Sequence, residues 1–288
     1  MKVQLWGTRG SVPTPRATAT RYGGNTSCVS VRATPRSLVV LDAGTGICSL
    51  NAELDDALDR VDILLSHLHM DHIIGLGFFS ALFRPGLDVH LWGPSSVTLR
   101  LGQRLARYLS PPLFPVRLRD LPCRLSLHDV PEGSFAVPGL VVTSARVCHP
   151  GPTVGYRLDD GEGVLTYLSD HEPALGARSF PDTPVWTSGH DLAADADVLI
   201  HDAQYTDAEY ATRIGWGHST FEHAVLFARS CGVGELILFH HDPSHDDIDL
   251  DAMHRAVIQR ADPTMKIVSG REGQTFTLGK DAGAEVAI

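Results

Sequence analysis

Cysteine is scarce in this chain, and long apolar runs are missing. The five cysteines are odd in number and form no Cys-x-x-Cys pair; they are Cys28, Cys48, Cys123, Cys148 and Cys231. Scattered thiols of this kind argue against a disulfide-stapled fold and indicate reduced cysteines in a cytoplasmic protein. Residues 1–10 contain no apolar core of a signal peptide, and the longest apolar stretch, residues 73–83, is too short to cross a bilayer. We therefore expect no membrane association.

Basic residues are outnumbered by acidic ones. Lys and Arg total 24 against 34 Asp and Glu, which gives a formal net charge of -10. Because long nucleic acids are bound through many Lys and Arg contacts to phosphates, this balance argues against a large polyanion as the partner. Apolar residues make up 43% of the chain and charged residues 20%, as in ordinary globular proteins. We expect residues 1–288 to form a single domain.

The most informative feature is a run of ionisable side chains directly after the apolar stretch 61–65. Its pattern is His-x-His-x-Asp-His, made by His67, His69, Asp71 and His72. Three imidazoles and a carboxylate behind a buried strand would be costly unless a cation neutralised them, and these groups are good ligands for zinc and similar metals. His67 and His69 would point the same way from an extended segment, while Asp71 and His72 could serve a second ion. The spacing therefore predicts two metal ions.

Apolar runs bounded by Gly, Pro and Thr predict strands in both halves of the chain. The expected strands are 1–6, 28–33, 38–41, 61–65, 89–92, 140–147, 154–158, 163–168, 198–200, 236–239, 266–269 and 274–278. Helical spacing predicts helices over 47–58, 73–83, 97–108, 221–229 and 247–259. Because strands come first and a helix second in each half, two packed sheets with helices outside is the simplest architecture, with an antiparallel meander at the start.

Three more residues of metal-ligand type stand just after predicted strands. They are His149, Asp170 and His240. Side chains at strand ends lie at the rim of a sheet, where functional sites are commonly built. Each residue alone is more often a cap or a surface group. Together with the His-x-His-x-Asp-His run, they indicate the remaining ligands of a two-metal site.

This order of motifs resembles that of the metallo-β-lactamase-fold hydrolases: His-x-His-x-Asp-His, then a single His, a single Asp and a last His, each after a strand. The resemblance covers nearly the whole chain and implies an α+β fold, a four-layer αββα sandwich. The implied ligands form two sets joined by a bridging carboxylate: His67, His69 and His149; Asp71, His72 and His240; and the bridge Asp170. The motifs are specific for fold and metal but not for substrate.

Two local points accompany this resemblance. Leu41-Asp42-Ala43-Gly44 is similar to the family's early strand, whose Asp buttresses the metal loop. His240 and His241 are adjacent and point oppositely if the strand continues. His240 is chosen as the ligand because the preceding Leu-Ile-Leu-Phe run matches the family pattern, and His241 stays open as a supporting or substrate-contacting residue.

A further pair of segments resembles the ribonuclease Z branch of the family. Asp202 follows a short buried strand, and His218 lies in a Gly-His-Ser-Thr turn before the helix 221–229. In that branch such a carboxylate pairs with the histidine, so Asp202 would orient His218 as the general acid that protonates the leaving oxygen. The implied reaction is phosphodiester hydrolysis by a hydroxide held between two ions, with Asp71 and Asp170 positioning that hydroxide. Capping of the helix by Ser219 or Thr220 does not compete with this role.

The expected substrate is a small phosphodiester or nucleotide, such as a cyclic nucleotide. The tRNA-processing members carry a basic Gly/Pro-rich arm that has no counterpart here, and the arginines in 97–108 more commonly mark a solvated helix face. Gly-rich loops near the start place Asn25 and Thr26 as candidate substrate contacts. The alternatives are an RNA or tRNA 3′-end endonuclease, a thioester or lactone hydrolase, and a non-enzymatic nucleotide sensor. The complete ligand set argues against the sensor.

The cofactors expected from the ligand types are two divalent metal ions. Zinc is the default for a His-rich site with carboxylates, and Mn²⁺ or Fe²⁺ would accept the same ligands. The ribonuclease Z resemblance also makes a homodimer a candidate assembly.

Overall fold

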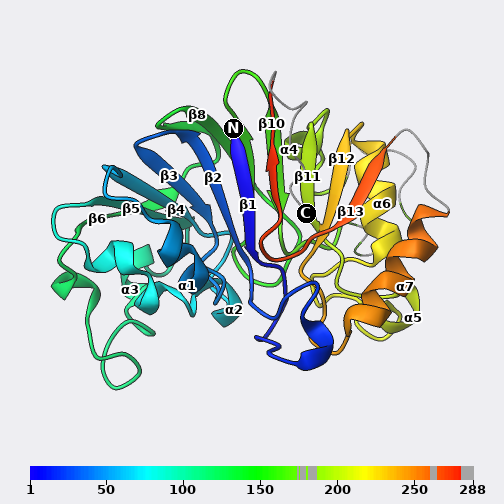
Figure 1. Ribbon diagram of the computed structural model, residues 1–288, viewed down its shortest axis with the longest axis horizontal. Helices are drawn as coiled ribbons and strands as arrows, with labels where there is room; N and C mark the ends of the chain where they lie inside the picture. The colour runs from blue at the N-terminus through cyan, green and yellow to red at the C-terminus, as the bar shows by residue number, and fades with distance from the viewer. Residues whose placement is uncertain (174, 176–179, 181–186, 260–264, 280–288) are drawn as a thin grey trace.

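Two seven-stranded sheets form the centre of the molecule (Figure 1). The computed structural model describes residues 1–173, 175, 180, 187–259 and 265–279. The first sheet, ordered β14-β1-β2-β3-β4-β5-β6, contains β1 (Lys2–Gly7), β2 (Cys28–Thr34), β3 (Ser37–Leu41), β4 (Arg60–Leu64), β5 (Asp88–Pro94), β6 (Arg124–Val130) and β14 (Thr275–Thr277). The second, ordered β13-β12-β11-β10-β9-β8-β7, contains β7 (Gly133–Val137), β8 (Leu140–Arg146), β9 (Val154–Asp159), β10 (Val164–Leu168), β11 (Val198–Asp202), β12 (Glu235–Phe239) and β13 (Lys266–Ser269).

Each sheet has an antiparallel part and a parallel part. The strands β1, β2 and β3 pair antiparallel, which confirms the meander expected at the start. From β3 to β6 the first sheet is parallel. In the second sheet β7 to β10 are antiparallel, and β10 to β13 are parallel. The residues that follow parallel neighbours leave a sheet at the same edge, which is where such folds place their sites.

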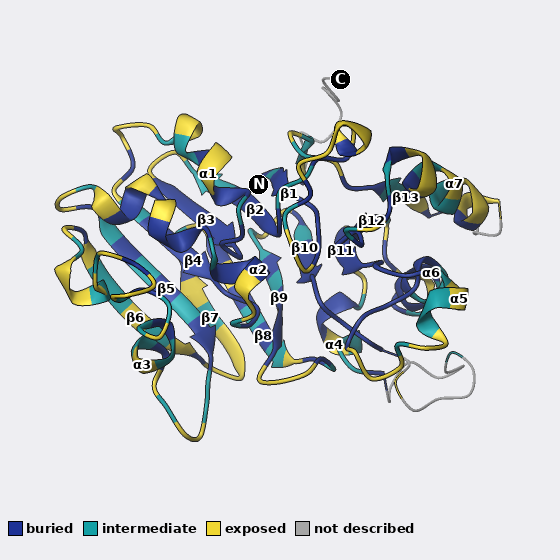
Figure 2. Cartoon of the chain, turned by 90° about the horizontal axis from the view of Figure 1, so that it is seen from below, coloured by how far each residue is buried: buried dark blue, intermediate teal, exposed yellow. Residues whose placement is uncertain are grey.

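Helices cover the two outer faces of the paired sheets. Those beside the first sheet are α1 (Ile47–Leu50), α2 (Met70–Ile73) and α3 (Leu101–Leu105), and those beside the second are α4 (His190–Ala193), α5 (Asp207–Tyr210), α6 (Phe221–Ser230) and α7 (Asp247–Ile258) (Figure 1). Three apolar clusters separate the layers. One lies between the sheets, one lies under α1 and α3, and one lies under α4, α6 and α7. Figure 2 shows the same layering, with buried strands inside and exposed helix faces outside.

The helices of the first half are shorter than the spacing predicted. The segment expected as one helix over 73–83 instead continues α2 into two short 3₁₀ turns, Leu76–Phe78 and Ser80–Phe83. Gly75 lies so close to the backbone of Gly44 that a Cβ there would be 2.2 Å from its carbonyl oxygen, so close packing prevails over helix extension. The expected helices 47–58 and 97–108 contract to α1, which is followed by a 3₁₀ turn over Asn51–Glu53, and to α3.

Two strands, β6 and β7, were missed by the sequence patterns because their residues alternate irregularly between exposed and half-buried positions. Both lie at the outer edges of their sheets, where one face packs loosely. Among the described helices, none is long and apolar enough to cross a membrane.

Candidate metal centre

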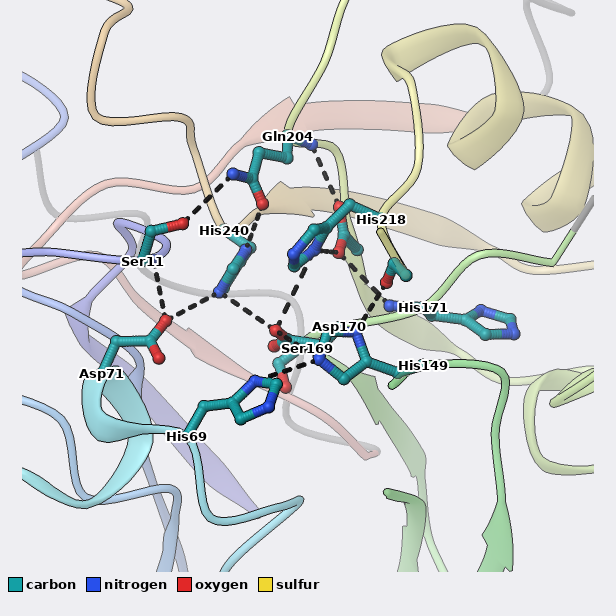
Figure 3. A network of polar contacts seen from close by, with 12 residues as sticks. Ser11, His69, Asp71, His149, Ser169, Asp170, His171, Gln204, His218 and His240 are labelled. Atoms are coloured by element: carbon teal, nitrogen blue, oxygen red, sulfur yellow. Dashed lines mark hydrogen bonds and ion pairs between the residues drawn. The ribbon is translucent and has the colours of Figure 1, made fainter. Parts of the chain in front are cut away.

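Side chains from both sheets meet where β4, β8, β10 and β12 end. The predicted ligands lie there, and they are His67, His69, Asp71, His72, His149, Asp170 and His240. The close approach requires both sheets. His67, His69 and His72 follow β4 of the first sheet, whereas His240 follows β12 of the second. Figure 3 shows His69, Asp71, His149, Asp170 and His240 pointing toward a common centre.

The first group of ligand atoms belongs to His67, His69 and His149. One nitrogen from each lies within 4.8 Å of the others. His149 Nε2 is 3.2 Å from His69 Nδ1, and the His67 and His69 rings are 4.4 Å apart between centroids. Three imidazoles at this spacing can converge on one ion.

The second group belongs to Asp71, His72 and His240, whose ligand atoms also lie within 4.8 Å of one another. Asp71 Oδ2 is 3.2 Å from His72 Nε2 and 3.3 Å from His240 Nε2. The short helix α2 supplies Asp71 and His72 as neighbours, so its formation brings both to the same side of the site.

Asp170 lies between the two groups. Its Oδ2 is 3.7 Å from His67 Nε2, and its Oδ1 is 3.1 Å from His72 Nε2. The same carboxylate is 3.4 Å from His240 Nε2. A carboxylate that contacts both groups has the position that a bridging ligand requires.

The buried polar atoms of this cluster fit divalent metals. His67 Nε2, His72 Nε2 and Asp170 Oδ1 are buried and form no hydrogen bond to any described residue. Such unpaired atoms are costly unless something else satisfies them. In addition, the Nδ1 atoms of His72 and His149 lie 2.8 Å from Asp42 Oδ2 and the Gly217 carbonyl. Donation of each Nδ1–H to these oxygens leaves the Nε2 lone pair facing the site, as metal-binding histidines require.

Comparisons with known proteins agree with this geometry. Residues 38–241 match the family model described as a beta-lactamase superfamily domain. The chain belongs to the β-lactamase superfamily. The ribonuclease Z of Synechococcus sp. (strain CC9605) is 27% identical, and the match covers 85% of this chain and 88% of that one.

Two solved structures share the superfamily fold. The metallo-β-lactamase fold protein YhfI from Bacillus subtilis has a TM-score of 0.69 at 19% identity and covers 96% of this chain and 99% of its own. A diphosphatase from the PhnP family has a TM-score of 0.67 at 18% identity, with 96% and 98% covered. The predicted family, its αββα fold and its class, a metal-dependent hydrolase, are confirmed.

Asp42 anchors the segment 66–72, which carries four of the candidate metal ligands. Its carboxylate is fully buried and accepts hydrogen bonds from Ser66 N–H at 2.7 Å, from His72 Nδ1–H at 2.8 Å and from Tyr167 O–H at 2.9 Å. The backbone of Asp42 has a φ of 58°, in the left-handed region that costs a non-glycine residue about 1 kcal/mol or more. The several donors compensate that strain, so one carboxylate ties β3 to β4 and β10.

A similar backbone conformation separates the roles of His240 and His241. His240 has a φ of 60°, and its side chain faces the cluster with Nδ1 at 3.1 Å from Gln204 Oε1. His241 is fully buried behind it, between the rings of Tyr22 and Phe221, and its Nε2–H donates to the Gly270 carbonyl. The structure thus brings His240 to the cluster and does not bring His241 there, so it gives no support to a substrate contact by His241.

His218 and Asp202 stand beside the two ligand groups. His218 Nδ1 is 2.7 Å from Asp202 Oδ2 and 3.9 Å from Asp170 Oδ2. Asp202 is fully buried, and its orientation is fixed by the backbone N–H of Gln204 and Ser219 at 3.0 and 3.1 Å. The predicted pair therefore forms, with His218 at the edge of the site.

Burial and mutual charge set the protonation of the cluster. Burial holds the pKa of His67 well below its usual range and also lowers the pKa of His149. His72 behaves oppositely: burial disfavours its charge, but Asp170, Asp71 and Asp42 together raise its pKa well above the ordinary value.

The structure places Asn25 and Thr26 in structural contacts. Asn25 Nδ2–H donates to Glu272 Oε2 at 2.9 Å, and fully buried Thr26 exchanges hydrogen bonds with Thr45 through backbone and hydroxyl groups. Neither residue is brought into the ligand groups. These contacts do not support the substrate role expected for them.

Sequence patterns missed Ser11 and Gln204, which also face the cluster (Figure 3). The Ser11 N–H donates to Asp71 Oδ2 at 2.7 Å, and Gln204 links the Ser11 hydroxyl to His240. Ser11 has a φ of 61°, so its conformation is set by the loop and not by its residue type. Gln204 lies two residues after Asp202, and this proximity was the only feature of the sequence that could have indicated its place near the site.

Proposed function

We propose that this protein is a dinuclear metal-dependent phosphodiesterase that acts on a small phosphodiester such as a cyclic nucleotide. The observation that carries the proposal is the position of the Asp202–His218 pair, 3.9 Å from the carboxylate that joins the two ligand groups. Hydrolysis of a phosphodiester needs charge neutralisation at phosphorus and a proton donor at the leaving oxygen. The site offers a group for each task.

The two ligand groups would hold the ions, with Asp170 shared between them. Two divalent ions bound there would supply an activated hydroxide near neutral pH and would offset the charge of the phosphate oxygens. Asp71 faces this space from α2, where the Ser11 N–H fixes its carboxylate at 2.7 Å. We assign Asp71 and Asp170 to positioning the attacking oxygen.

His218 would donate the proton. Its Nδ1 is engaged by Asp202, so Nε2 is the atom that can reach a substrate, and 11% of the side chain is exposed. Burial lowers the pKa of His218, although Asp170 and Asp71 act in the opposite direction. An anionic phosphate bound nearby would counteract this lowering of the pKa and so favour the acid form.

The ribonuclease Z relative makes RNA 3′-end cleavage the second candidate. The similarity to it extends over 85% of the chain, so the two proteins share more than the metal ligands. A net charge of -10 favours the small substrate, because each contact to a polynucleotide phosphate needs a cation. A protein of similar fold is a diphosphatase of the PhnP family, which supports phosphate chemistry as the proposed activity.

A substrate panel separates these candidates. Bis(p-nitrophenyl) phosphate, a cyclic nucleotide, a tRNA precursor with a 3′ trailer, a thioester and a lactone would be assayed with the zinc-loaded protein. We expect the cyclic nucleotide to give the highest kcat/KM and His218→Ala to lower it by about 10²–10⁴-fold. Preferred cleavage of the tRNA precursor would establish the second candidate. Tight nucleotide binding without turnover would instead favour a sensor.

We also propose zinc as the native metal, the cytoplasm as the location and a homodimer as the assembly. Zinc suits a site with five imidazoles and two carboxylates, and the five cysteines are unpaired, as in a reducing compartment. Elemental analysis of protein purified without added metal would test the first point. Light scattering would test the third, with a monomer as the contrary result.

A further inference from the structure

Glu172 is a buried carboxylate close to the metal centre that the proposed reaction leaves without a role. It lies two positions after Asp170, and only 1% of the residue is exposed. Within the described part of the chain it forms no ion pair with a lysine, arginine or histidine at 4.0 Å or less. Burying a carboxylate in this way is costly unless hydrogen bonds replace its hydration. Its partners therefore show what the chain gains from it.

The three groups that donate hydrogen bonds to the Glu172 carboxylate all lie in the short segment 210–217. Its Oε1 accepts hydrogen bonds from the Tyr210 hydroxyl at 2.7 Å and from the Gly215 N–H at 2.8 Å. Its Oε2 accepts a hydrogen bond from the Gly217 N–H at 2.7 Å. The two oxygens thus hold the ends of the turn Gly215-Trp216-Gly217, which we call the clamped turn.

The clamped turn packs directly on His149. Gly215 and Gly217 have φ values of 87° and 88°, which L side chains rarely adopt. A Cβ on Gly217 would lie 2.2 Å from Pro150 Cδ and 2.3 Å from His149 Nδ1. The backbone can approach the imidazole this closely only because glycine occupies the position.

Two functional imidazoles depend on the backbone that Glu172 holds. The Gly217 carbonyl accepts the Nδ1–H of His149 at 2.8 Å, which directs His149 Nε2 toward His67 and His69. The next residue is His218, whose Nδ1 lies 2.7 Å from Asp202. A shift of the turn would therefore move a ligand of one ion and the proton donor together.

We propose that Glu172 is a positioning residue that sets the imidazoles of His149 and His218 through the clamped turn. The inference rests on the proposed function for the role of His218, whereas the part that concerns His149 needs only metal binding. Glu172→Gln tests it with little change in volume. A glutamine has one acceptor oxygen, so one of the two glycine N–H groups would face an NH₂ group and lose its partner.

The first expected result concerns metal affinity. In Glu172→Gln one of the two ions should bind about 10–100-fold more weakly, because supports of this kind typically have that effect when removed. The ion at Asp71, His72 and His240 should keep its affinity. Titration with a chelator of known zinc affinity would release one ion in each of two steps in the wild type. In the variant, one ion would be released at a lower chelator concentration.

The second expected result concerns the leaving group. Loss of proton donation should slow a substrate whose leaving group is a ribose oxygen by up to about 10²–10⁴-fold. A p-nitrophenyl ester should slow far less, because p-nitrophenolate leaves without a proton. The ratio of the two kcat values therefore reports on His218, and a general loss of folded protein would not change that ratio.

Tyr210→Phe is the matched control. It removes one hydrogen bond to the same carboxylate and leaves both glycine contacts in place, so metal steps and kcat ratio should stay as in the wild type. If Glu172→Gln does not fold, Glu172→Asp, which keeps the charge on a shorter side chain, should show both effects in weaker form. Unchanged metal affinity and ratio in a folded Glu172 variant, or equal effects in Tyr210→Phe, would overturn the inference. A wild type that hydrolyses no phosphodiester would refute the proposed function, and the chelator titration would still decide the role toward His149.

Discussion

Asp42→Asn should destabilise the protein far more than a one-atom change suggests. The wild-type carboxylate accepts hydrogen bonds from Ser66, His72 and Tyr167, all at 2.7–2.9 Å and all buried. An asparagine that keeps its oxygen toward Ser66 N–H turns an NH₂ group toward His72 Nδ1–H and Tyr167 O–H. Besides the Ser66 and Ser169 hydroxyls, which also contact Oδ2, these two donors then lose a charged acceptor.

The expected loss follows from those two donors. Hydrogen bonds to charged groups contribute about 1.5–3 kcal/mol each, so the free energy of unfolding should fall by about 3–6 kcal/mol. Asparagine tolerates the left-handed backbone at this position somewhat better than aspartate, which offsets less than about 1 kcal/mol. Against a typical stability of about 5–15 kcal/mol this loss is large.

Urea unfolding of the metal-free protein measures this effect without a contribution from bound ions. Asp62→Asn is the matched control, because Asp62 is also fully buried on β4 but pairs with Arg60 and Trp92 away from the cluster. Both variants should lose stability, and only Asp42→Asn should also weaken zinc binding, through the freed His72 ring. A loss below about 1 kcal/mol in Asp42→Asn, or equal zinc affinity in the two variants, would refute the reasoning.

Three further outcomes are expected. His240→Ala should retain one of two zinc ions by elemental analysis, whereas His241→Ala should retain both and lose only stability; the reverse result would exchange their roles. Chelator treatment should abolish hydrolysis and lower the thermal unfolding midpoint, since an ion present at 100 times its Kd adds about 2.7 kcal/mol, and zinc should restore both. Asn25→Ala should leave KM unchanged and reduce stability by about 1 kcal/mol through the lost Glu272 contact; a raised KM would return Asn25 to the substrate site.

The residues of the candidate metal centre could be picked out because their types are chemically unusual at strand ends. His67, His69, Asp71 and His72 lie within six consecutive residues, so the sequence alone reveals them as one motif. The later ligands carried a weaker signal, which became useful only in the order of the whole set. The strands were well predicted for a related reason: runs such as Leu236 to Phe239 are buried on both faces.

The predictions failed where packing, and not residue type, decides the conformation. The helix expected over 73–83 breaks because Gly75 must lie against Gly44. Asn25 and Thr26 have the residue types of substrate contacts, and their observed hydrogen bonds go to neighbouring loops, so their substrate role stays a prediction without support from the structure. Nothing in the local sequence distinguishes these cases from the expected ones.

The sequence by itself determined the ligand types, their order and the apolar strands that precede them, because these depend on side-chain chemistry and short-range spacing. Only the tertiary structure decided which of His240 and His241 faces the cluster of candidate ligands, since a backbone turn with positive φ sets that direction. It likewise decided that Glu172, Gln204 and Ser11 support the site. Their contacts join residues tens to hundreds of positions apart, and such contacts exist only once both sheets have packed.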